Sequence, residues 1–230
     1  MKRFFLLSIA VLLLNVSVFA QGVYLKVETF KIPHYKSNLP PDRFSGIGID
    51  SRNGHISLSG EDVWCEIPYR AGQPDFARSF IAPTKGFQLT AVASAPGGVY
   101  VYDSLSNAIM AGNASYPLSQ RMNRVTGMAY YRGKIYIADD DAGQIYEIQL
   151  SRGKAEIERS FKAHHAICGL AADSSALYSC DNQTIYAYDA AMNVVARYKL
   201  DVRINGLTVS GPDEFLAPAQ NKNEIYRIRK

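Results

Sequence analysis

The sequence is poor in net charge. The 230 residues include 25 Lys and Arg and 21 Asp and Glu, which gives a formal net charge of +4 at pH 7. Proteins that bind nucleic acids or anionic membranes mainly through charge carry a much stronger basic excess. We therefore predict no nucleic-acid partner and no attachment to a membrane surface.

Long apolar runs are also lacking, with one exception at the start of the chain. Lys2 and Arg3 are followed by an apolar run from Phe4 to Leu14. Val18 and Ala20 then supply small residues at the positions where a signal peptidase requires them. This pattern predicts a secretory signal peptide over residues 1–20. An uncleaved anchor is the alternative, but the run is short for a bilayer span. We expect residues 21–230 to form a single exported domain, periplasmic or extracellular and monomeric, with no stable membrane span after cleavage.

No long stretch has helical periodicity, and the chain instead contains five copies of one unit. Each unit has a small opening residue, a short apolar run, a Gly, Ser or Asn turn, an alternating aromatic and aliphatic strand, a second turn and another strand. The five units are SGIGIDSRNGHISLSGEDVWCEI, TAVASAPGGVYVYDSLSNAIMAG, TGMAYYRGKIYIADDDAGQIYEI, CGLAADSSALYSCDNQTIYAYDA and NGLTVSGPDEFLAPAQNKNEIYRI. Their opening positions, separated by 45, 36, 42 and 37 residues, are Gly46, Ala91, Gly127, Gly169 and Gly206.

A repeat of this length with three visible strands is typical of a β-propeller blade. A fourth, outer strand is expected between units, and DFARSFIA, AEIERSFKA and NVVARYKL are candidates. The fifth unit leaves no residues for its outer strand, but VYLKVETFKI before the first unit could supply it and hide an edge. We predict an all-β, five-bladed propeller of four-stranded antiparallel blades. A six-bladed propeller and a β-sandwich of irregular hairpins are the alternatives.

Two of the units resemble known propeller repeats. The stretch GMAYYRGKIYIADDDAGQIYEI resembles an NHL-type repeat, and NGLTVSGPDEFLA is similar to a unit of the senescence-marker/gluconolactonase propellers. The resemblance covers nearly all of the chain after residue 20 at the level of the repeat. It implies a propeller fold and leaves the function open, because this superfamily contains both enzymes and binding scaffolds.

The resemblance to lactonase-type propellers implies one divalent metal at the mouth of the central channel, held by a Glu, an Asn and an Asp near the starts of inner strands. The positions just before the opening small residues are here Ser45, Thr90, Thr126, Cys168 and Asn205. Only Asn205 matches, and a hard divalent cation prefers several oxygen ligands that include carboxylates. We predict no metal, no cofactor and no catalytic residue. A lactonase-like hydrolase with a divergent site is the alternative function.

Three consecutive aspartates, residues 139–141, raise the question of a metal-binding loop. Only Asp139 belongs to the repeat, at the position of Asp103 and Asp181 in other units. Adjacent carboxylates lack the alternate spacing with which a calcium loop converges its ligands. We interpret Asp140 and Asp141 as turn residues that bond their own backbone.

Two adjacent histidines are a second candidate for metal binding. Neighbouring residues in a strand point to opposite faces, so His164 and His165 are poorly placed to chelate one ion. We expect one of them to be exposed and the other packed. The sequence also lacks a glycine-rich phosphate loop and a nucleophile-elbow motif.

Charged residues recur on one predicted face of the propeller, where the loops enter the inner strands. Three positions before the opening residues come Arg43, Gln88, Arg124, Ala166 and Arg203. The ends of the second strands carry Gly60, Asp103, Asp139, Asp181 and Pro218. One interpretation is Arg–Asp pairing that fixes the loops and needs no ligand.

The other interpretation is a ligand site at the junction of units five and one. Arg203 and Arg43 meet there when the ring closes, and neither unit has the matching aspartate. With Asn205 and Ser45 they predict a site for a carboxylate, a phosphate or an acidic peptide segment. The remaining candidates of this ring are Gln88 and Arg124. We therefore predict an exported scaffold that binds a protein partner or a small anionic ligand through one face, without catalysis.

Cysteine is scarce, with only three in the chain. Cys168 and Cys180 bracket a turn in the fourth unit and are expected opposite one another on adjacent strands, where Cβ atoms lie about 4.5–5.5 Å apart. A disulfide fits that separation and an oxidising compartment. Two buried free thiols are the alternative, and Cys65 is expected to be a free core residue.

Overall fold

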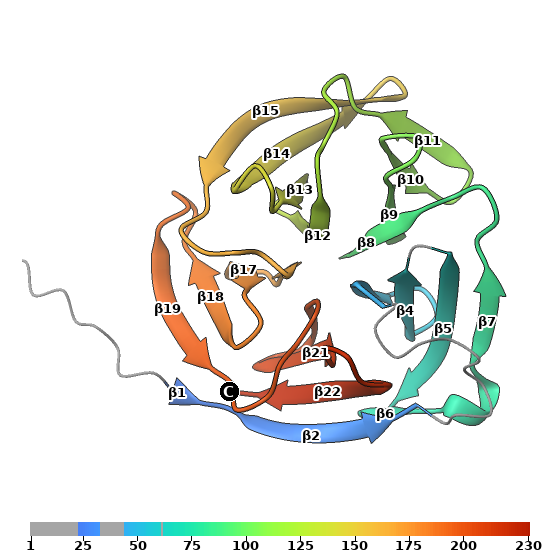
Figure 1. Cartoon of the computed structure of the whole chain (residues 1–230), viewed down its shortest axis with the longest axis vertical. Coiled ribbons are helices and arrows are strands. Elements are labelled where there is room, and N and C mark those ends of the chain that lie inside the picture. Colours follow the sequence, from blue (N-terminus) through green and yellow to red (C-terminus); the bar gives the residue numbers. More distant parts are fainter. Residues whose placement is uncertain (1–22, 33–43, 61) are drawn as a thin grey trace, which may run out of the picture.

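The predicted five-bladed propeller is confirmed. In the computed structural model, which describes residues 23–32, 44–60 and 62–230, five sheets built on four antiparallel strands each surround one axis (Figure 1). Within those residues, no helix is long and apolar enough to cross a bilayer.

The five blades follow one another along the chain. Blade 1 contains β3 (Gly46–Asp50), β4 (His55–Gly60), β5 (Val63–Arg70) and β7 (Phe80–Pro83), with short β6 (Gln73–Pro74) on β5. Blade 2 contains β8 (Leu89–Ala95), β9 (Gly98–Asp103), β10 (Ala108–Ala111) and β11 (Ala114–Pro117). Blade 3 contains β12 (Val125–Tyr131), β13 (Lys134–Asp139), β14 (Gln144–Ser151) and β15 (Lys154–Lys162). Blade 4 contains β16 (Gly169–Ala172), β17 (Leu177–Cys180), β18 (Thr184–Tyr188) and β19 (Val194–Lys199). Blade 5 contains β20 (Thr208–Gly211), β21 (Glu214–Pro218), β22 (Glu224–Arg229) and β2 (Lys26–Lys31).

The outer strands occur in the three segments where the sequence predicts them. AEIERSFKA contributes most of β15, and NVVARYKL contains β19. In DFARSFIA only the second half joins the sheet as β7, because its first half forms the 3₁₀ helix η2 (Phe76–Arg78). The Asp75 side chain accepts a hydrogen bond from Arg78 N at 3.3 Å and so caps that short helix. Strand β11 is an outer strand for which the sequence offered no candidate.

The N-terminal segment closes the ring, as predicted. Strand β2 pairs antiparallel with β22 along its whole length, with Thr29 opposite Tyr226, and β1 (Val23–Tyr24) adds a short parallel pairing to β19 (Figure 1). A buried arginine joins the two ends of the chain: Arg227 forms ion pairs with Glu28 of β2 and Glu214 of β21. The outer edge of β22 is therefore covered by the other end of the protein.

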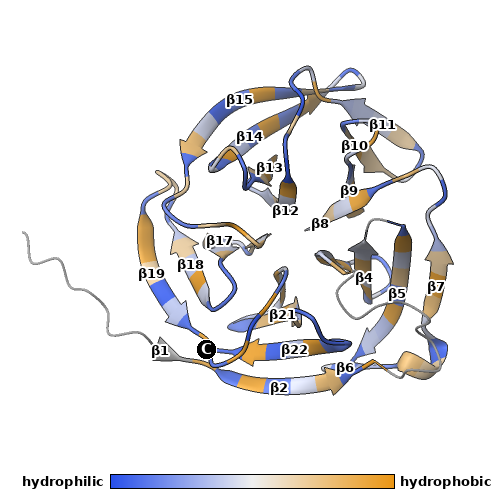
Figure 2. Cartoon of the chain, viewed as in Figure 1, coloured by the Kyte–Doolittle hydropathy of each residue, from blue (hydrophilic) through white to orange (hydrophobic). Residues whose placement is uncertain are grey.

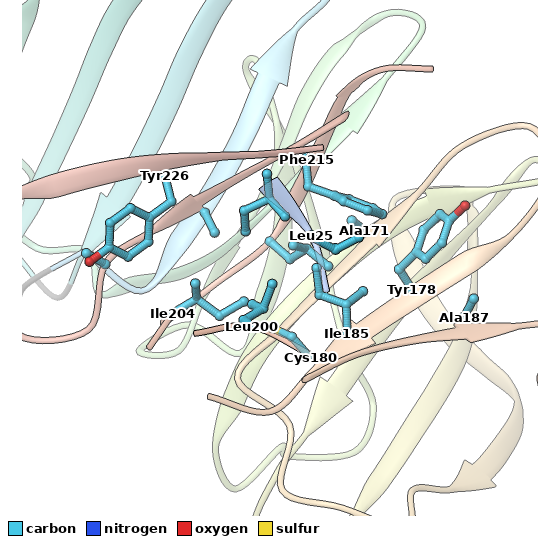
Figure 3. Packing of buried hydrophobic residues seen from close by; sticks show 14 of the residues in the cluster. Leu25, Ala171, Tyr178, Cys180, Ile185, Ala187, Leu200, Ile204, Phe215 and Tyr226 are labelled. Carbon is cyan, nitrogen blue, oxygen red and sulfur yellow. The ribbon is translucent and has the colours of Figure 1, made fainter. Parts of the chain in front are cut away.

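The core consists of apolar layers between blades. Successive residues of a strand point to opposite faces, so each blade contributes side chains to both of its neighbours. Strand β17 is accordingly buried along its whole length, whereas the outer strand β19 alternates between half-buried and exposed residues (Figure 2). Between blades 4 and 5, Tyr178 of β17 meets Phe215 of β21 edge-on with 5.0 Å between ring centroids (Figure 3). Burial of a side chain of this size contributes about 1.5–3 kcal/mol.

The small opening residues of the repeat have a structural cause at the propeller axis. The inner strands approach so closely that a Cβ atom added at Gly127 would lie 2.4 Å from Leu170 N. A Cβ at Gly169 would lie 2.7 Å from Leu207 N, and one at Gly206 would lie 2.7 Å from Ser45 O. These neighbours are backbone atoms that cannot move aside, so the blades meet there without side chains.

Candidate functional site

The candidate residues lie on the face made by the loops that enter the inner strands and the turns between second and third strands, here called the loop face. Three of them occupy equivalent positions. The carbonyl oxygens of Gln88, Arg124 and Arg203 each accept a hydrogen bond from the first residue of the adjacent turn in the same blade. The donors are Ser104 N at 2.9 Å, Asp140 N at 3.0 Å and Gln220 N at 3.0 Å. The backbone of the loop face thus repeats between blades 2, 3 and 5.

The side chains at these equivalent positions differ in their partners. In blade 2, the Ser104 hydroxyl donates to Gln88 Oε1 at 2.7 Å. In blade 3, the Arg124 guanidinium forms ion pairs with Asp140 and, at 2.7 Å, with Asp141. In blade 5, Arg203 is exposed and makes no side-chain hydrogen bond or ion pair to another described residue.

The turn beside Arg203 also holds an unsatisfied polar atom. Gln220 takes the place of Asp140 in blade 5, and its Oε1 is buried without a hydrogen-bond partner. Since buried polar atoms are nearly always paired in folded proteins, this one marks an incomplete network. Lys222, two residues further along this turn, is exposed; its Nζ lies 4.0 Å from Glu224, and it also interacts with the Tyr226 side chain. Blade 5 therefore presents an arginine without an acidic partner, and a lysine with only a long ion pair, where blade 3 presents a neutralised arginine.

The aspartates of the repeat do not form the predicted Arg–Asp pairs. Asp181 accepts hydrogen bonds from Gln183 N and Thr184 N of its own turn, both at 2.7 Å, whereas Asp139 and Asp103 bond the incoming loop. Asp139 is only 1% exposed and accepts hydrogen bonds from Asn123 N at 2.8 Å and Arg124 N at 3.1 Å. Asp103 accepts from Gln88 N in the same way, at 2.8 Å. A buried carboxylate is satisfied by the backbone donors of the incoming loop, so the arginine side chains find other partners.

The interpretation of Asp140 and Asp141 as residues bonding their own backbone was wrong. Asp140 Oδ1 accepts a hydrogen bond from Ile167 N at 2.6 Å, which joins blade 3 to the loop entering blade 4. Asp141 forms the second ion pair with Arg124. Both carboxylates thus bind donors outside the turn, namely Ile167 N of the next loop and the Arg124 guanidinium.

Of the five positions at which lactonase-type propellers place metal ligands, three serve here to join blades. Ser45 Oγ donates to Thr90 O of blade 2 at 3.1 Å, and Thr126 Oγ1 donates to Ile167 O at 2.6 Å. Asn205 Nδ2 donates to Phe44 O at 3.2 Å, across the junction of blades 5 and 1. Hydroxyl and amide groups that donate to carbonyls, with no carboxylate among them, do not fit a hard divalent cation. No group of three or more His, Cys, Asp or Glu side chains in the described ranges could hold a metal ion.

These contacts also bear on the predicted anion site. Ser45 and Asn205 each use a donor for a contact between blades, and neither forms a hydrogen bond with Arg203. Arg43 lies outside the described residues, although its neighbour Phe44 contacts Asn205 at the expected junction of blades 5 and 1. Among the described members of the set, Arg203 is thus the cation that has no acidic partner.

The histidines behave as the sequence predicts: His164 is exposed, and His165 is half-buried and stacked on Tyr186 with 3.8 Å between ring centroids. His165 Nδ1 donates to Ala166 O at 2.8 Å, so Nε2 is an acceptor for the hydroxyls of Ser179 and Tyr188, both 3.0 Å away. The two hydroxyls are also 2.9 Å from each other, so one donates to Nε2 and the other to its neighbour. Burial lowers the pKa of His165 below its usual value. Ser179 is 0% exposed, so this Ser–His pair holds a loop and does not present a nucleophile.

The paired cysteines lie close together, as the sequence predicts. Cys168 N donates to Cys180 O, and the two sulfur atoms are 2.7 Å apart. Cys65 is buried between blades 5 and 1. The disulfide stays a prediction. We expect mass spectrometry of unreduced protein to show the two peptides linked, and separate peptides with free thiols would contradict it.

No family model matches the chain, and no curated protein matches its sequence. The structure is similar to glutaminyl cyclase from Myxococcus xanthus, with a TM-score of 0.67 and 13% identity over 91% of this chain and 98% of that one. It is also similar to regucalcin, a calcium-binding protein from Agrobacterium tumefaciens (TM-score 0.57, 13% identity, 90% and 95% covered). A gluconolactonase from Xanthomonas campestris is a third match (TM-score 0.56, 10% identity, 81% and 71% covered).

The chain has a β-propeller fold related to those of lactonases and cyclases. Identities of 10–13% show this fold and carry no substrate or catalytic residue across. The structural similarity agrees with the resemblance of the repeats to gluconolactonase units. Any inference about the function must therefore rest on the side chains of this chain itself.

Proposed function

We propose that the protein is an exported, non-catalytic binding scaffold that captures a carboxylate or phosphate group at Arg203 on the loop face. The observation that supports this proposal is the difference between two equivalent arginines. Arg124 is neutralised by Asp140 and Asp141, whereas Arg203 faces a turn that contains Gln220 and no acid next to it. A free guanidinium offers a planar fork of donors that matches carboxylates and phosphates.

Neighbouring groups favour the same ligand chemistry. Lys222 lies on the same turn as Gln220 and supplies a second positive charge. A ligand that carries a hydroxyl or amide beside its anionic group can also satisfy the buried Gln220 Oε1. The bound group is thus expected on an acidic small molecule or an acidic residue of a protein partner. Export rests on the sequence pattern of residues 1–20.

Binding of citrate and of inorganic phosphate tests this proposal by calorimetry at low ionic strength. Replacing Arg203 with alanine should weaken binding of the better probe roughly 10- to 100-fold, since a hydrogen bond to a charged group contributes about 1.5–3 kcal/mol. The matched control is Arg70→Ala, which removes the same charge from an exposed position at the far end of β5, on the opposite face. Equal affinities of both variants, or no binding by the wild-type protein, would refute the proposal.

A further inference from the structure

One interface of the propeller is packed unlike the others. In the described residues, buried apolar clusters join blades 4 and 5, 2 and 3, 5 and 1, and 3 and 4. Within the part of the chain that the structure describes, the interface between blades 1 and 2 has no such cluster. The cause is visible at one position of the second strand, which pairs with the residue two places after the opening residue of each repeat. There the five blades carry Ser57, Tyr100, Tyr136, Tyr178 and Leu216. Blade 1 thus has a serine where the other blades have a large side chain.

Small residues let the inner strands of blades 1 and 2 come very close. A Cβ atom added at Gly48 of β3 would lie 2.6 Å from Val92 Cγ1 of β8. Ile49 N donates to Ser94 Oγ at 2.7 Å across the same gap. Nearer the outer strands, the side chains of blades 1 and 2 do not fill the space between the two blades. A pocket of about 300 Å³ remains there. Its lining residues are Arg52, Trp64, Phe87, Leu89, Val99, Val101, Met110 and Gly112.

The lining of this pocket, here called the blade 1–2 pocket, is mostly apolar. Trp64 of β5 contributes the largest ring, and its Nε1 donates to Glu66 Oε1 at 3.0 Å, so the indole needs no further acceptor. Val99 and Val101 of β9 and Met110 of β10 belong to blade 2. The volume is at the low end of small-molecule sites, about 300–1,000 Å³, which are also lined mainly by apolar and aromatic groups.

The polar part of the pocket is a guanidinium that is already neutralised. Arg52 Nε and Nη2 donate to the Asp50 carboxylate at 3.0 and 2.6 Å. Three of the five guanidinium hydrogens are left for another acceptor. Glu66 is a second nearby acid that acts electrostatically on Arg52. The local charge therefore disfavours a carboxylate and favours an uncharged acceptor such as a carbonyl or hydroxyl oxygen.

Unsatisfied hydroxyls concentrate in the same interface. Ser57 Oγ, Ser59 Oγ and Thr90 Oγ1 are buried and have no hydrogen-bond partner among the described residues. Ser59 pairs directly with Trp64 across β4 and β5, so its side chain is on the same face as the indole. Such atoms are rare in well-packed interiors, and proteins tolerate them chiefly at functional sites.

From these features we infer that the blade 1–2 pocket binds an uncharged, mainly apolar small molecule, with a ring against Trp64 and a hydrogen-bond acceptor at Arg52. This site is separate from Arg203, so it does not depend on the proposed anion site. A ligand here would also fill the interface that lacks its own apolar cluster. Binding should therefore raise the melting temperature of the protein.

The test uses Trp64 as a built-in reporter, because it is the only tryptophan in the chain. Benzyl alcohol, benzoate and benzylamine are probes of similar size and different charge. We expect benzyl alcohol to change the Trp64 emission saturably and each charged probe to bind at least 10-fold more weakly. No saturable response to benzyl alcohol, or tighter binding of a charged probe, would overturn the inference.

Variants show whether the response arises in the pocket. Val101→Phe should fill the space and weaken benzyl alcohol at least 10-fold, whereas the matched control Val195→Phe, at a position 59% exposed on β19, should not. If Val101→Phe does not fold, Val99→Leu reduces the volume more gently and should weaken binding severalfold. Arg203→Ala should leave benzyl alcohol unaffected. Unchanged binding in a folded pocket variant would place the probe elsewhere and contradict the inference.

Discussion

Replacing Gly127 with alanine is expected to destabilise the protein by about 3 kcal/mol or more, as forced overpacking against rigid groups does. The new Cβ atom would lie 2.4 Å from Leu170 N, 2.6 Å from Gly169 C and 2.8 Å from Gly169 Cα. All three atoms are backbone of the neighbouring inner strand, so relief requires blades 3 and 4 to move apart. Urea unfolding followed by circular dichroism measures the change in the free energy of unfolding.

The matched control is Gly97→Ala. A Cβ atom at Gly97 would meet nothing within 4 Å, and its φ lies outside the positive range. Substitutions at such surface positions change stability by less than about 0.5 kcal/mol. If Gly127→Ala and Gly97→Ala had the same unfolding free energy, the inner strands could not be as close as the structure has them.

The number of blades was predictable because the axis imposes a residue type on every unit. Inner strands that meet backbone to backbone need a small residue at the same point of each repeat, as Gly127 and Gly169 show. This requirement does not depend on function. The closing strand was predictable for a related reason, because Lys26–Lys31 had no unit of its own and the fifth unit lacked an outer strand.

The partners of the loop residues were not predictable in the same way. The sequence aligned Arg124 with Arg203, and the backbone hydrogen bonds agree with that alignment. It assigned the wrong carboxylate to Arg124, because Asp139 is buried against backbone donors and the next two residues face the guanidinium. The acids that pair with Arg124 lie one and two residues beyond Asp139 in the turn. The spacing of the repeats does not distinguish between such neighbouring residues.

The sequence does contain a feature that accompanies the blade 1–2 pocket. Ser57 stands where three other blades have tyrosine and one has leucine. Aligned blades reveal such a loss of side-chain volume, but the outcome depends on how the neighbouring blade responds. Here β8 closes on the inner half of β3 and β4, and Trp64 is left lining an open outer half.

Removal of the closing strand is expected to have the largest effect of all. A chain that begins at residue 33 lacks β2, which pairs with β22 from Lys26↔Arg229 to Lys31↔Glu224. Phe30 is 8% exposed in the cluster between blades 5 and 1, and loss of one such ring costs about 3–5 kcal/mol. Total stabilities are only about 5–15 kcal/mol, so we expect the cooperative unfolding transition to be lost.

The truncated chain should also associate. Without β2, the strand β22 presents unpaired backbone groups along its outer edge, and exposed edges of this kind pair with other chains. Buried Arg227 would lose Glu28 and keep only the 3.9 Å ion pair with Glu214, so a buried charge at that edge would be less well compensated. The control begins at Val23 and keeps β1 and β2, so it should unfold cooperatively and elute as a monomer in size-exclusion chromatography. A monomeric residue-33 chain with the same melting temperature as this control would show that the ring does not depend on its N-terminal strand.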